Sequence, residues 1–549
     1  MARALLVSYA GYPYTPSSLT PDNGLANLAG ALHEAGHEVR VLDYGTVSMM
    51  RRLFPAELSA VLRPVAARLV QGGGAPSPEA LQQLQALSSA LEAHQAAQLA
   101  ALAEELAAEV RAFQPAFVGF KLWNGDGFTG TVALAERLRR EWPDLPLYGG
   151  GPQASWFREI IYRRTDVFTA LAYGEGESLI LDLLEHAVAG RPLESLPGVI
   201  FRQDGQVRMT AEGEPVDLNR LPFPVYDETV YPAMAGQEKA KLLVLDDSRG
   251  CPYACGFCTH PVESGRRLRT ASAAALVDRM EQLGRRHGYH IFRFSGSSTP
   301  GRLMRETAEE ILRRGLDVTY TCFGHFASAD QDHFEIMARS GLRAIFFGLE
   351  SGCQDILDRA TGKPIRLSEV KETMHRAQQA GIFTLASMIV PLPFDTEETL
   401  QESLDFVLDA RPDAIPVQFP GLLPGTPWMA DPARYNIEMP DRDTFLEEGL
   451  DYKIKLLFPP AYWKPLPYRI NGLDFHQFIA LTARFVGALE QAGLLTAVPD
   501  DNVLLAELAG MTPRSFRDHA RLWHLTGDAE AVAEMVQKVN AGAVRARQE

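Results

Sequence analysis

Residues 248–260 read SRGCPYACGFCTH and place three cysteines at the spacing C-x3-C-x2-C. The whole chain has five cysteines in 549 residues, so three of them fall within one short segment that contains glycine. The apolar run KLLVLDDSRG (241–250) comes directly before the first cysteine and predicts a β-strand. We therefore expect the cysteines on a loop at the carboxyl end of that strand.

Further apolar runs follow the cysteines, and helical patterns separate them. The runs cover residues 290–294, 318–323, 344–348, 383–390 and 414–419. With the strand before the cysteines they make six β/α units, which are too few to close an eight-stranded barrel. We predict a partial (β/α)6 barrel over residues 241–430. Active sites of such barrels lie on the loops after the strands, where the cysteines fall.

Three cysteines on one loop have three possible explanations. A structural zinc ion needs a fourth ligand, for which His260 is the only close candidate, and zinc sites usually join two separated ligand clusters. Burial as small apolar side chains explains the isolated Cys322 and Cys353, but not the group of three. Thiolates also hold iron–sulfur clusters, and three cysteines leave one iron of a [4Fe-4S] cluster open to another ligand. The pattern favours the cluster, with zinc as the alternative.

Residues 1–195 alternate strand and helix patterns, which predicts a Rossmann-like α/β domain with a parallel sheet. Ligands bind such sheets at the carboxyl ends of the strands, which here are loops rich in small residues. One loop contains G-x-G-x-x-G, formed by Gly125, Gly127 and Gly130. It follows the third predicted strand rather than the first, so glycines required by a tight turn explain it as well as a dinucleotide site does. The predicted strands cover 4–10, 37–43, 116–123, 145–151 and 168–174.

Three further segments complete the predicted organisation. A helical insertion covers residues 46–113, in which Ser77 has the character of an N-cap and Pro78 that of a first helical residue. A linker covers residues 196–240, and a mainly helical domain covers residues 431–549. The last domain is rich in aromatic residues, some of which we predict to line a substrate pocket, with packing against the barrel as the alternative. These residues are Tyr462, Trp463, Tyr468 and His476.

The segment CPYACGFC (251–258) resembles the C-x3-C-x-aromatic-C signature of radical S-adenosylmethionine (SAM) enzymes, whose fold is a partial barrel. In that family the three cysteines hold a [4Fe-4S] cluster, and the open iron chelates the amino and carboxylate groups of SAM. The resemblance assigns the cluster to Cys251, Cys255 and Cys258. The SAM contacts that it implies are Phe257, Ser295, Gly296, Ser297, Ser298, Glu350, Ile389 and Val390.

The segment RFSGSSTP (293–300) departs from the family pattern. The family usually has a Gly-Gly-Glu-like segment here, whose acid binds the amino group of SAM, whereas this chain has hydroxyls and no carboxylate. A charge-assisted hydrogen bond to SAM is then absent, unless another residue replaces the acid. The departure resembles the tryptophan methylase type of thiostrepton biosynthesis, thought to act without cleaving SAM to a radical.

The strand-end loops GGGPQAS (149–155) and YGEGE (173–177) resemble those of the cobalamin-binding domain in cobalamin-dependent radical SAM enzymes, most of which are methyltransferases. The domain contains no D-x-H-x-x-G motif, so we expect cobalamin to bind without a histidine on its lower face. The cobalamin contacts that the resemblance implies are Asn124, Gly125, Asp126, Gly149, Gly150, Gly151, Pro152, Gln153, Gly174, Glu175 and Gly176.

The resemblance implies an enzyme that transfers a methyl group from SAM, through cobalamin, to a carbon of a small natural-product precursor or amino acid. Tryptophan is one candidate substrate, and an external one-electron reductant is an expected partner. The first alternative keeps both cofactors but catalyses ring contraction or oxidative cyclisation. The second is a non-catalytic metal-binding protein.

Composition narrows the class of partner and the compartment. The formal net charge of −16 argues against nucleic acid or an anionic membrane surface as a partner. No apolar run approaches the ~20 residues that a membrane-spanning helix needs. The odd number of cysteines and a start, MARALLVSYA, without a signal-peptide pattern predict a cytoplasmic protein.

Overall fold

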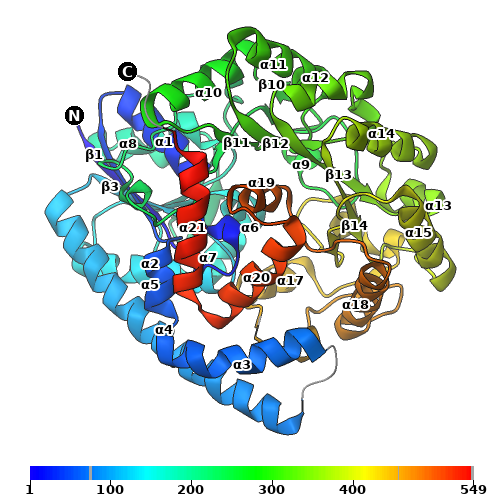
Figure 1. The fold of residues 1–549 in the computed structure, drawn as a ribbon. Coiled ribbons are helices and arrows are strands. Elements are labelled where there is room, and N and C mark those ends of the chain that lie inside the picture. Colours follow the sequence, from blue (N-terminus) through cyan, green and yellow to red (C-terminus); the bar gives the residue numbers. More distant parts are fainter. Residues whose placement is uncertain (73–76, 456, 546–549) are drawn as a thin grey trace. The chain divides into compact units, whose positions relative to one another are not determined.

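The computed structural model describes residues 1–72, 77–455 and 457–545 (Figure 1). The chain divides into two compact units. Unit 1 comprises Met1–Ala240, Asp443–Pro459 and Asp518–Gln537, and unit 2 comprises Lys241–Arg442, Pro460–Arg517 and Lys538–Glu549. Residues 73–76 of the predicted insertion, and residues 456 and 546–549 of the predicted C-terminal domain, lie outside the described residues.

Unit 1 is built on a sheet with the strand order β2-β1-β3-β4-β5-β6-β7. The first five of these strands are parallel, which confirms the predicted Rossmann-like sheet. β6 and β7 add an antiparallel hairpin within the segment 196–240, and sequence pattern missed it because every residue of β7 is exposed. The strands are β1 (Arg3–Ser8), β2 (Glu38–Asp43), β3 (Phe117–Lys121), β4 (Leu147–Gly150), β5 (Ala170–Ala172), β6 (Val199–Gln203) and β7 (Gln206–Met209).

Helices connect and flank these strands. The helix start predicted at Ser77 and Pro78 is confirmed by α4 (Pro78–Phe113), whose N-cap Ser77 accepts a hydrogen bond from Ala80 N at 3.2 Å. With 36 residues, α4 is about 54 Å long. The other helices of the N-terminal part are α1 (Asn23–Glu34), α2 (Val47–Leu53), α3 (Ala56–Gly72), α5 (Asp126–Glu141), α6 (Pro152–Phe157), α7 (Ile161–Arg164) and α8 (Gly176–Ala189).

Unit 2 is built on a second parallel sheet, with the strand order β15-β14-β13-β12-β11-β8. Each of the six predicted strands is present within the described residues, so the partial barrel is confirmed. The strands are β8 (Leu243–Leu245), β11 (Ile291–Phe294), β12 (Thr319–Gly324), β13 (Leu342–Glu350), β14 (Phe383–Ile389) and β15 (Val417–Gln418). The helices between them are α9 (His260–Glu263), α10 (Ala273–His287), α11 (Gly301–Arg314), α12 (Phe334–Arg339), α13 (Gln354–Ile356), α14 (Leu367–Gln379) and α15 (Glu397–Ala410).

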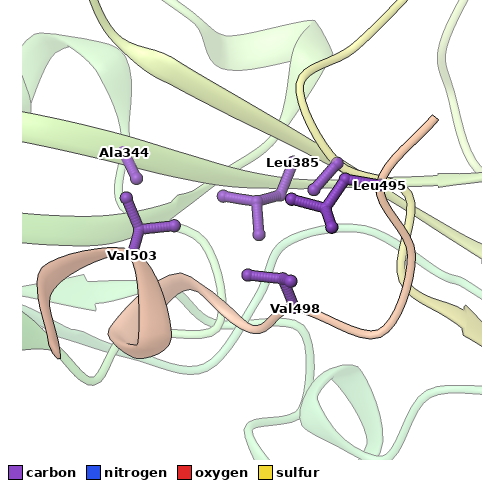
Figure 2. Packing of buried hydrophobic residues seen from close by; sticks show 6 residues of the cluster. Ala344, Leu385, Leu495, Val498 and Val503 are labelled. Carbon is purple, nitrogen blue, oxygen red and sulfur yellow. The ribbon is translucent and has the colours of Figure 1, made fainter. Parts of the chain in front are cut away.

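The C-terminal residues are mainly helical, as predicted, and they belong to both units. In unit 2, Val498 and α19 (Asp500–Leu508) cover one face of the barrel sheet. Figure 2 shows Leu495, Val498 and Val503 facing side chains of β13 and β14, and the buried cluster consists of Ala344, Leu385, Ala414, Leu495, Val498 and Val503. The other helices of this region are α16 (Pro427–Ala430), α17 (Arg442–Leu450), α18 (Phe475–Gln491), α20 (Pro513–Thr526) and α21 (Ala529–Ala543).

A buried ion pair fixes α19 on the sheet. Arg293 of β11 donates two hydrogen bonds to Asp500, at 2.8 and 2.7 Å, and Asp500 is fully buried. Thr321 of β12 donates to the same carboxylate at 2.9 Å. These contacts attach α19 to β11 and β12 of the sheet. Within the described part of the chain, no helix is both long and apolar enough to cross a membrane.

Candidate functional site

The predicted cysteine loop follows β8 and is bound to two distant segments of unit 2. Gly256 N donates to Thr361 O at 2.8 Å, and Trp428 N donates to Gly256 O at 3.0 Å. Trp428 is fully buried, and its indole Nε1 donates to Ala360 O at 2.8 Å. A Cβ on Gly256 would lie 3.0 Å from Nε1 of Trp428, so the close approach requires glycine. These contacts fix the path of the loop between the cysteines.

The three predicted cluster ligands lie in one electrostatic environment. Cys251 and Cys255 are buried and Cys258 is half-buried. Burial raises the pKa of Cys255 to about 12 and that of Cys258 to about 11, and each thiol also interacts electrostatically with the other two. Metal binding reverses this shift, because a coordinating thiol is deprotonated. Three such thiols on one rigid loop fit the ligand set of a [4Fe-4S] cluster.

A single metal ion is a different case. Among residues 1–72, 77–455 and 457–545, no group of three or more His, Cys, Asp or Glu side chains is arranged to hold one ion. His260, the candidate fourth zinc ligand, is exposed at the start of α9.

Glu350, a predicted SAM contact, is buried at the end of β13 and paired with a lysine. Lys363 Nζ donates to Glu350 Oε1 at 2.8 Å, and both side chains are 7% exposed. Burial lowers the pKa of Lys363, but the charges of Glu350 and the nearby thiols outweigh it and hold the pKa above its usual value. Gly348 leaves room for the pair, because a Cβ there would collide with both charged groups. Lys363 lies in no apolar pattern, so sequence analysis did not identify it.

The predicted Ser-Gly-Ser-Ser segment is held by an acid that lies outside it. Asp247, which is fully buried just after β8, accepts from Gly296 N at 2.7 Å, and from Thr299 Oγ1 at 2.8 Å and Ser248 Oγ at 2.9 Å. Burial raises the pKa of Asp247 to about 6, although these hydrogen bonds oppose the shift. Ser297 Oγ donates to Gly250 O at 3.0 Å, so the segment is also tied to the cysteine loop.

These contacts bear on the prediction that Gly296 contacts SAM. The Gly296 N–H is occupied by Asp247 and is not a free donor for SAM. Ser298 is buried and Ser295 is exposed. An acid at the end of an apolar strand, directly before the cysteines, was the signal that could have identified Asp247.

The remaining predicted residues of unit 2 are dispersed. Phe257 packs on Trp428 with ring centroids 5.7 Å apart, Ile389 ends β14, and Val390 is buried. Of the predicted substrate residues, Tyr462 is exposed, and the ring Nε2 of His476 lies 3.0 Å from Trp463 O.

Tyr468 differs from the other three predicted substrate residues. It is 3% exposed, and its ring packs on Phe478 with centroids 5.3 Å apart. Its hydroxyl donates to Pro420 O. These contacts are those of a packing residue.

Unit 1 resolves the role of its G-x-G-x-x-G sequence. A Cβ on Gly127 would lie 2.6 Å from Trp123 Cβ, and one on Gly130 would collide with the Tyr9 ring. Both glycines therefore permit α5 to pack against the end of β1. Gly125 has φ +59°, and its N–H donates to Leu450 O at 2.8 Å. Packing accounts for all three glycines.

The other glycine loops of unit 1 are less constrained. A Cβ on Gly150 would lie 3.6 Å from Ala172 Cβ, an ordinary contact, whereas Gly151 and Gly174 have positive φ values of +96° and +79°. Gln153 Oε1 is buried without a hydrogen-bond partner among the described residues. An unpaired buried acceptor fits a ligand rich in amide N–H groups, such as cobalamin.

The other predicted cobalamin contacts lie on the same loops. Asn124 and Asp126 are exposed, and Lys453 Nζ lies 2.7 Å from Asp126 Oδ1. Glu175 accepts from Val216 N at 2.8 Å. Gly149 lies in the sheet, and Pro152 and Gly176 begin α6 and α8.

A buried charge network lies beneath these loops and was not predicted. Lys239 Nζ lies 2.5 Å from Asp43 Oδ2, both side chains are almost fully buried, and the Tyr231 hydroxyl donates to the same acid. Asp22 N donates to the Tyr231 hydroxyl at 2.9 Å. Burial raises the pKa of Asp22, but the charge of Lys121 outweighs it and lowers that pKa below its usual value. The network lies at the ends of β2 and β3 beside β1, where the strand order reverses and ligands of such sheets bind.

Unit 1 also has a surface cavity of about 670 Å³ between α2, α3 and the start of α21. Two ion pairs line it, Arg51 with Glu530 at 2.7 Å and Arg63 with Asp528 at 2.9 Å. None of the predicted site residues lines this cavity.

Comparison with known proteins identifies unit 2. Residues 246–407 match the model of the Radical SAM superfamily, and this range begins at the end of β8 and includes the three cysteines. Residues 246–407 are a radical SAM domain. The predicted enzyme class is therefore confirmed, and the non-catalytic alternative is set aside. Radical SAM chemistry implies a [4Fe-4S] cluster and SAM.

Two curated relatives show the range of the similarity. An uncharacterized methyltransferase of Pyrococcus horikoshii is 24% identical over 330 residues, which are 58% of this chain and 70% of that protein. The anaerobic magnesium-protoporphyrin IX monomethyl ester cyclase of Rubrivivax gelatinosus is 25% identical over 296 residues, 52% of each protein. The chain thus spans about half the length of the cyclase.

One solved structure is similar over nearly the whole chain. It is the radical SAM methyltransferase TsrM from Kitasatospora setae, with cobalamin and a [4Fe-4S] cluster bound. The TM-score is 0.65 at 17% sequence identity, and the match covers 97% of this chain and 100% of that one. At this identity the similarity shows the shared fold.

Proposed function

We propose that this protein is a cobalamin-dependent radical SAM methyltransferase acting on a carbon of a small natural-product precursor or amino acid. The observation that carries the proposal is that one chain contains both a three-cysteine loop in unit 2 and, in unit 1, a parallel sheet whose strand-end loops are rich in glycine. The Pyrococcus relative, described as a methyltransferase, and the TsrM fold support it.

Each unit has a separate task in this proposal. When bound, the cluster supplies electrons and anchors SAM, and cobalamin carries the methyl group from SAM to the substrate. Cys251, Cys255 and Cys258 hold the cluster, and the contacts of Gly256 keep the loop rigid. The loops after β3, β4 and β5 hold cobalamin, with Gln153 accepting a hydrogen bond from it. An external one-electron reductant supplies electrons to the cluster.

The Ser-Gly-Ser-Ser segment after the second barrel strand lacks the acid that the family has there. Asp247 replaces that acid only in its structural role, which is to hold the segment in place. Its carboxylate binds the segment from behind and is fully buried, so it does not offer a charge to the amino group of SAM. We propose that SAM is held without that charge-assisted contact, as in the tryptophan methylase type that the sequence resembles. Tryptophan is then the first substrate to test.

Ring closure is the second candidate function, because the Rubrivivax relative is a cyclase. The two functions consume SAM differently. Methyl transfer converts SAM to S-adenosylhomocysteine, and radical cleavage converts it to 5′-deoxyadenosine.

The test is chromatography of both nucleosides against product, with reconstituted protein, a reductant, cobalamin and tryptophan or related amino acids. We expect S-adenosylhomocysteine in proportion to a methylated product. Equal 5′-deoxyadenosine would show that methyl transfer also uses the radical. Product formed with 5′-deoxyadenosine and no S-adenosylhomocysteine would establish the cyclase type and reject methyl transfer.

A further inference from the structure

His325 follows β12 at its carboxyl end and belongs to none of the predicted sites. Its side chain is buried, with 5% of the residue exposed. The imidazole ring stacks on the ring of Tyr253, with centroids 3.9 Å apart and planes inclined by 19°. Tyr253 lies between Cys251 and Cys255 in the sequence, so the imidazole lies directly against the cysteine loop.

The hydrogen bonding of the ring assigns its tautomer. Ala327 N donates to Nδ1 of His325 at 3.1 Å, so Nδ1 is an acceptor and carries no proton. The proton of the neutral ring is then on Nε2. Burial and the positive charge of Lys363 lower the pKa of His325 to about 3, so the ring stays neutral at physiological pH. Nε2–H is therefore a permanent neutral donor.

This donor is unused. Nε2 is buried and has no hydrogen-bond partner in the part of the chain that the structure describes. Leaving a buried polar group without a partner destabilises the fold, and such groups are rare in folded proteins. Capping of the turn at Phe326–Ser328 uses Nδ1, and stacking on Tyr253 uses the ring face. Neither contact explains why Nε2–H of His325 is buried without an acceptor among the described residues.

The charge around His325 favours an anionic acceptor. Lys363 interacts electrostatically with His325 and with all three thiols, and in each case its positive charge lowers the pKa. The imidazole donor and the ammonium group therefore act on the same region beside the cysteine loop.

We propose that Nε2–H of His325 donates a hydrogen bond to an electron-rich acceptor of the cofactors held at the cysteine loop. Two acceptors have this chemistry, a sulfur atom of the cluster and the carboxylate of SAM. The inference rests on the proposed function, because it requires the cluster at Cys251, Cys255 and Cys258.

Two substitutions separate the donor from the structural roles of the ring. His325→Asn places an amide oxygen near Nδ1, which keeps the cap on Ala327 N and removes the donor at Nε2. His325→Gln reaches farther and returns an N–H donor near the Nε2 position. Tyr253→Leu removes the stacking partner and leaves the donor. His333→Asn, at a half-buried histidine outside the cysteine loop, is the matched control for the His-to-Asn change.

The experiment measures iron and sulfide content, the midpoint potential of the cluster without SAM, and the affinity for SAM by equilibrium dialysis, all under anaerobic conditions. If the acceptor is the SAM carboxylate, His325→Asn weakens SAM binding about tenfold or more and leaves the potential unchanged. If the acceptor is a cluster sulfur, the potential becomes more negative, because hydrogen bonds to sulfur raise it. In both cases His325→Gln recovers part of the effect, and His333→Asn has none.

Full iron content with unchanged potential and unchanged SAM affinity in His325→Asn would overturn the inference. An equal effect of Tyr253→Leu, without recovery in His325→Gln, would assign the role to stacking and also overturn it. If His325→Asn does not fold, the comparison of His325→Gln with Tyr253→Leu decides. Wild-type protein that binds no iron after reconstitution would instead reject the proposed function.

Discussion

Lys239 in unit 1 and Lys363 in unit 2 are both buried and both paired with a carboxylate, but their surroundings differ. Around Lys239 the network consists of protein groups alone, since its Nζ lies 2.5 Å from Asp43 and donates to Thr20 O at 3.1 Å. Around Lys363 there are three thiols and an imidazole whose Nε2–H has no partner in the described structure. A network whose polar groups are paired with one another stabilises a fold. A network that borders thiols and an unpaired donor has groups available to a ligand.

The largest expected effect tests whether the thiols near Lys363 bind a metal cluster. Replacing Cys251, Cys255 or Cys258 by Ala should reduce bound iron to trace levels, because each thiolate holds one iron. Cys322→Ala and Cys353→Ala are the controls, since neither lies on the loop, and both should keep the wild-type iron content. Iron analysis of anaerobically reconstituted protein measures the effect. A loop variant with full iron would contradict the assignment.

The next effect tests whether the network around Lys239 stabilises the fold. Lys239→Met leaves the buried carboxylate of Asp43 without its countercharge, which should lower the free energy of unfolding by about 3–5 kcal/mol. The double variant Lys239→Met with Asp43→Leu should recover much of this loss, because it removes both charges. Urea denaturation followed by circular dichroism measures both. Wild-type stability in Lys239→Met would show that the network contributes nothing to the fold.

A pH effect of similar size concerns Asp247. Burial raises its pKa from 3.8 to about 6, so between these values the folded protein binds more protons than the unfolded chain, and stability falls as pH rises. The loss amounts to about 3 kcal/mol, is complete above pH 6 and is absent below pH 4. Asp247→Asn should remove this dependence, and Asp246→Asn, at the neighbouring acid, should keep it. Unfolding of the apoprotein at pH 4, 5, 6 and 7 provides the comparison.

The smallest effect sharpens the role of unit 1. Gly150→Leu should weaken hydroxocobalamin binding about tenfold, because the side chain extends from the last residue of β4 while its Cβ makes only an ordinary contact with Ala172. Gly487→Leu, on α18 with open space around it, is the matched control for the added side chain. Gly174→Leu is expected to weaken binding too, but its φ of +79° adds strain. Unchanged affinity in Gly150→Leu would place the ligand elsewhere.

The sequence by itself determined most of the elements and nominated the three cysteines as candidate metal ligands. Apolar runs separated by helical patterns were sufficient for eleven strands of two parallel sheets, because strand and helix periodicity are local. Ser77 and Pro78 marked the start of α4 for the same reason. The cysteine spacing was equally informative, since all three proposed cluster ligands lie on one short loop.

Only the tertiary structure decided how the site is supported. Asp43 and Tyr231 are 188 positions apart in the chain, and Arg293 and Asp500 are 207 apart, so no local pattern relates them. The exposed strand β7 was missed because it buries no face. No sequence pattern identified His325, because a single histidine after a strand is not distinctive. Only the structure shows that Tyr253 stacks on its ring and that its Nε2 has no hydrogen-bond partner among the described residues. Burial removes water as a partner, so only the tertiary structure shows which buried polar groups are paired within the fold and which lack a partner.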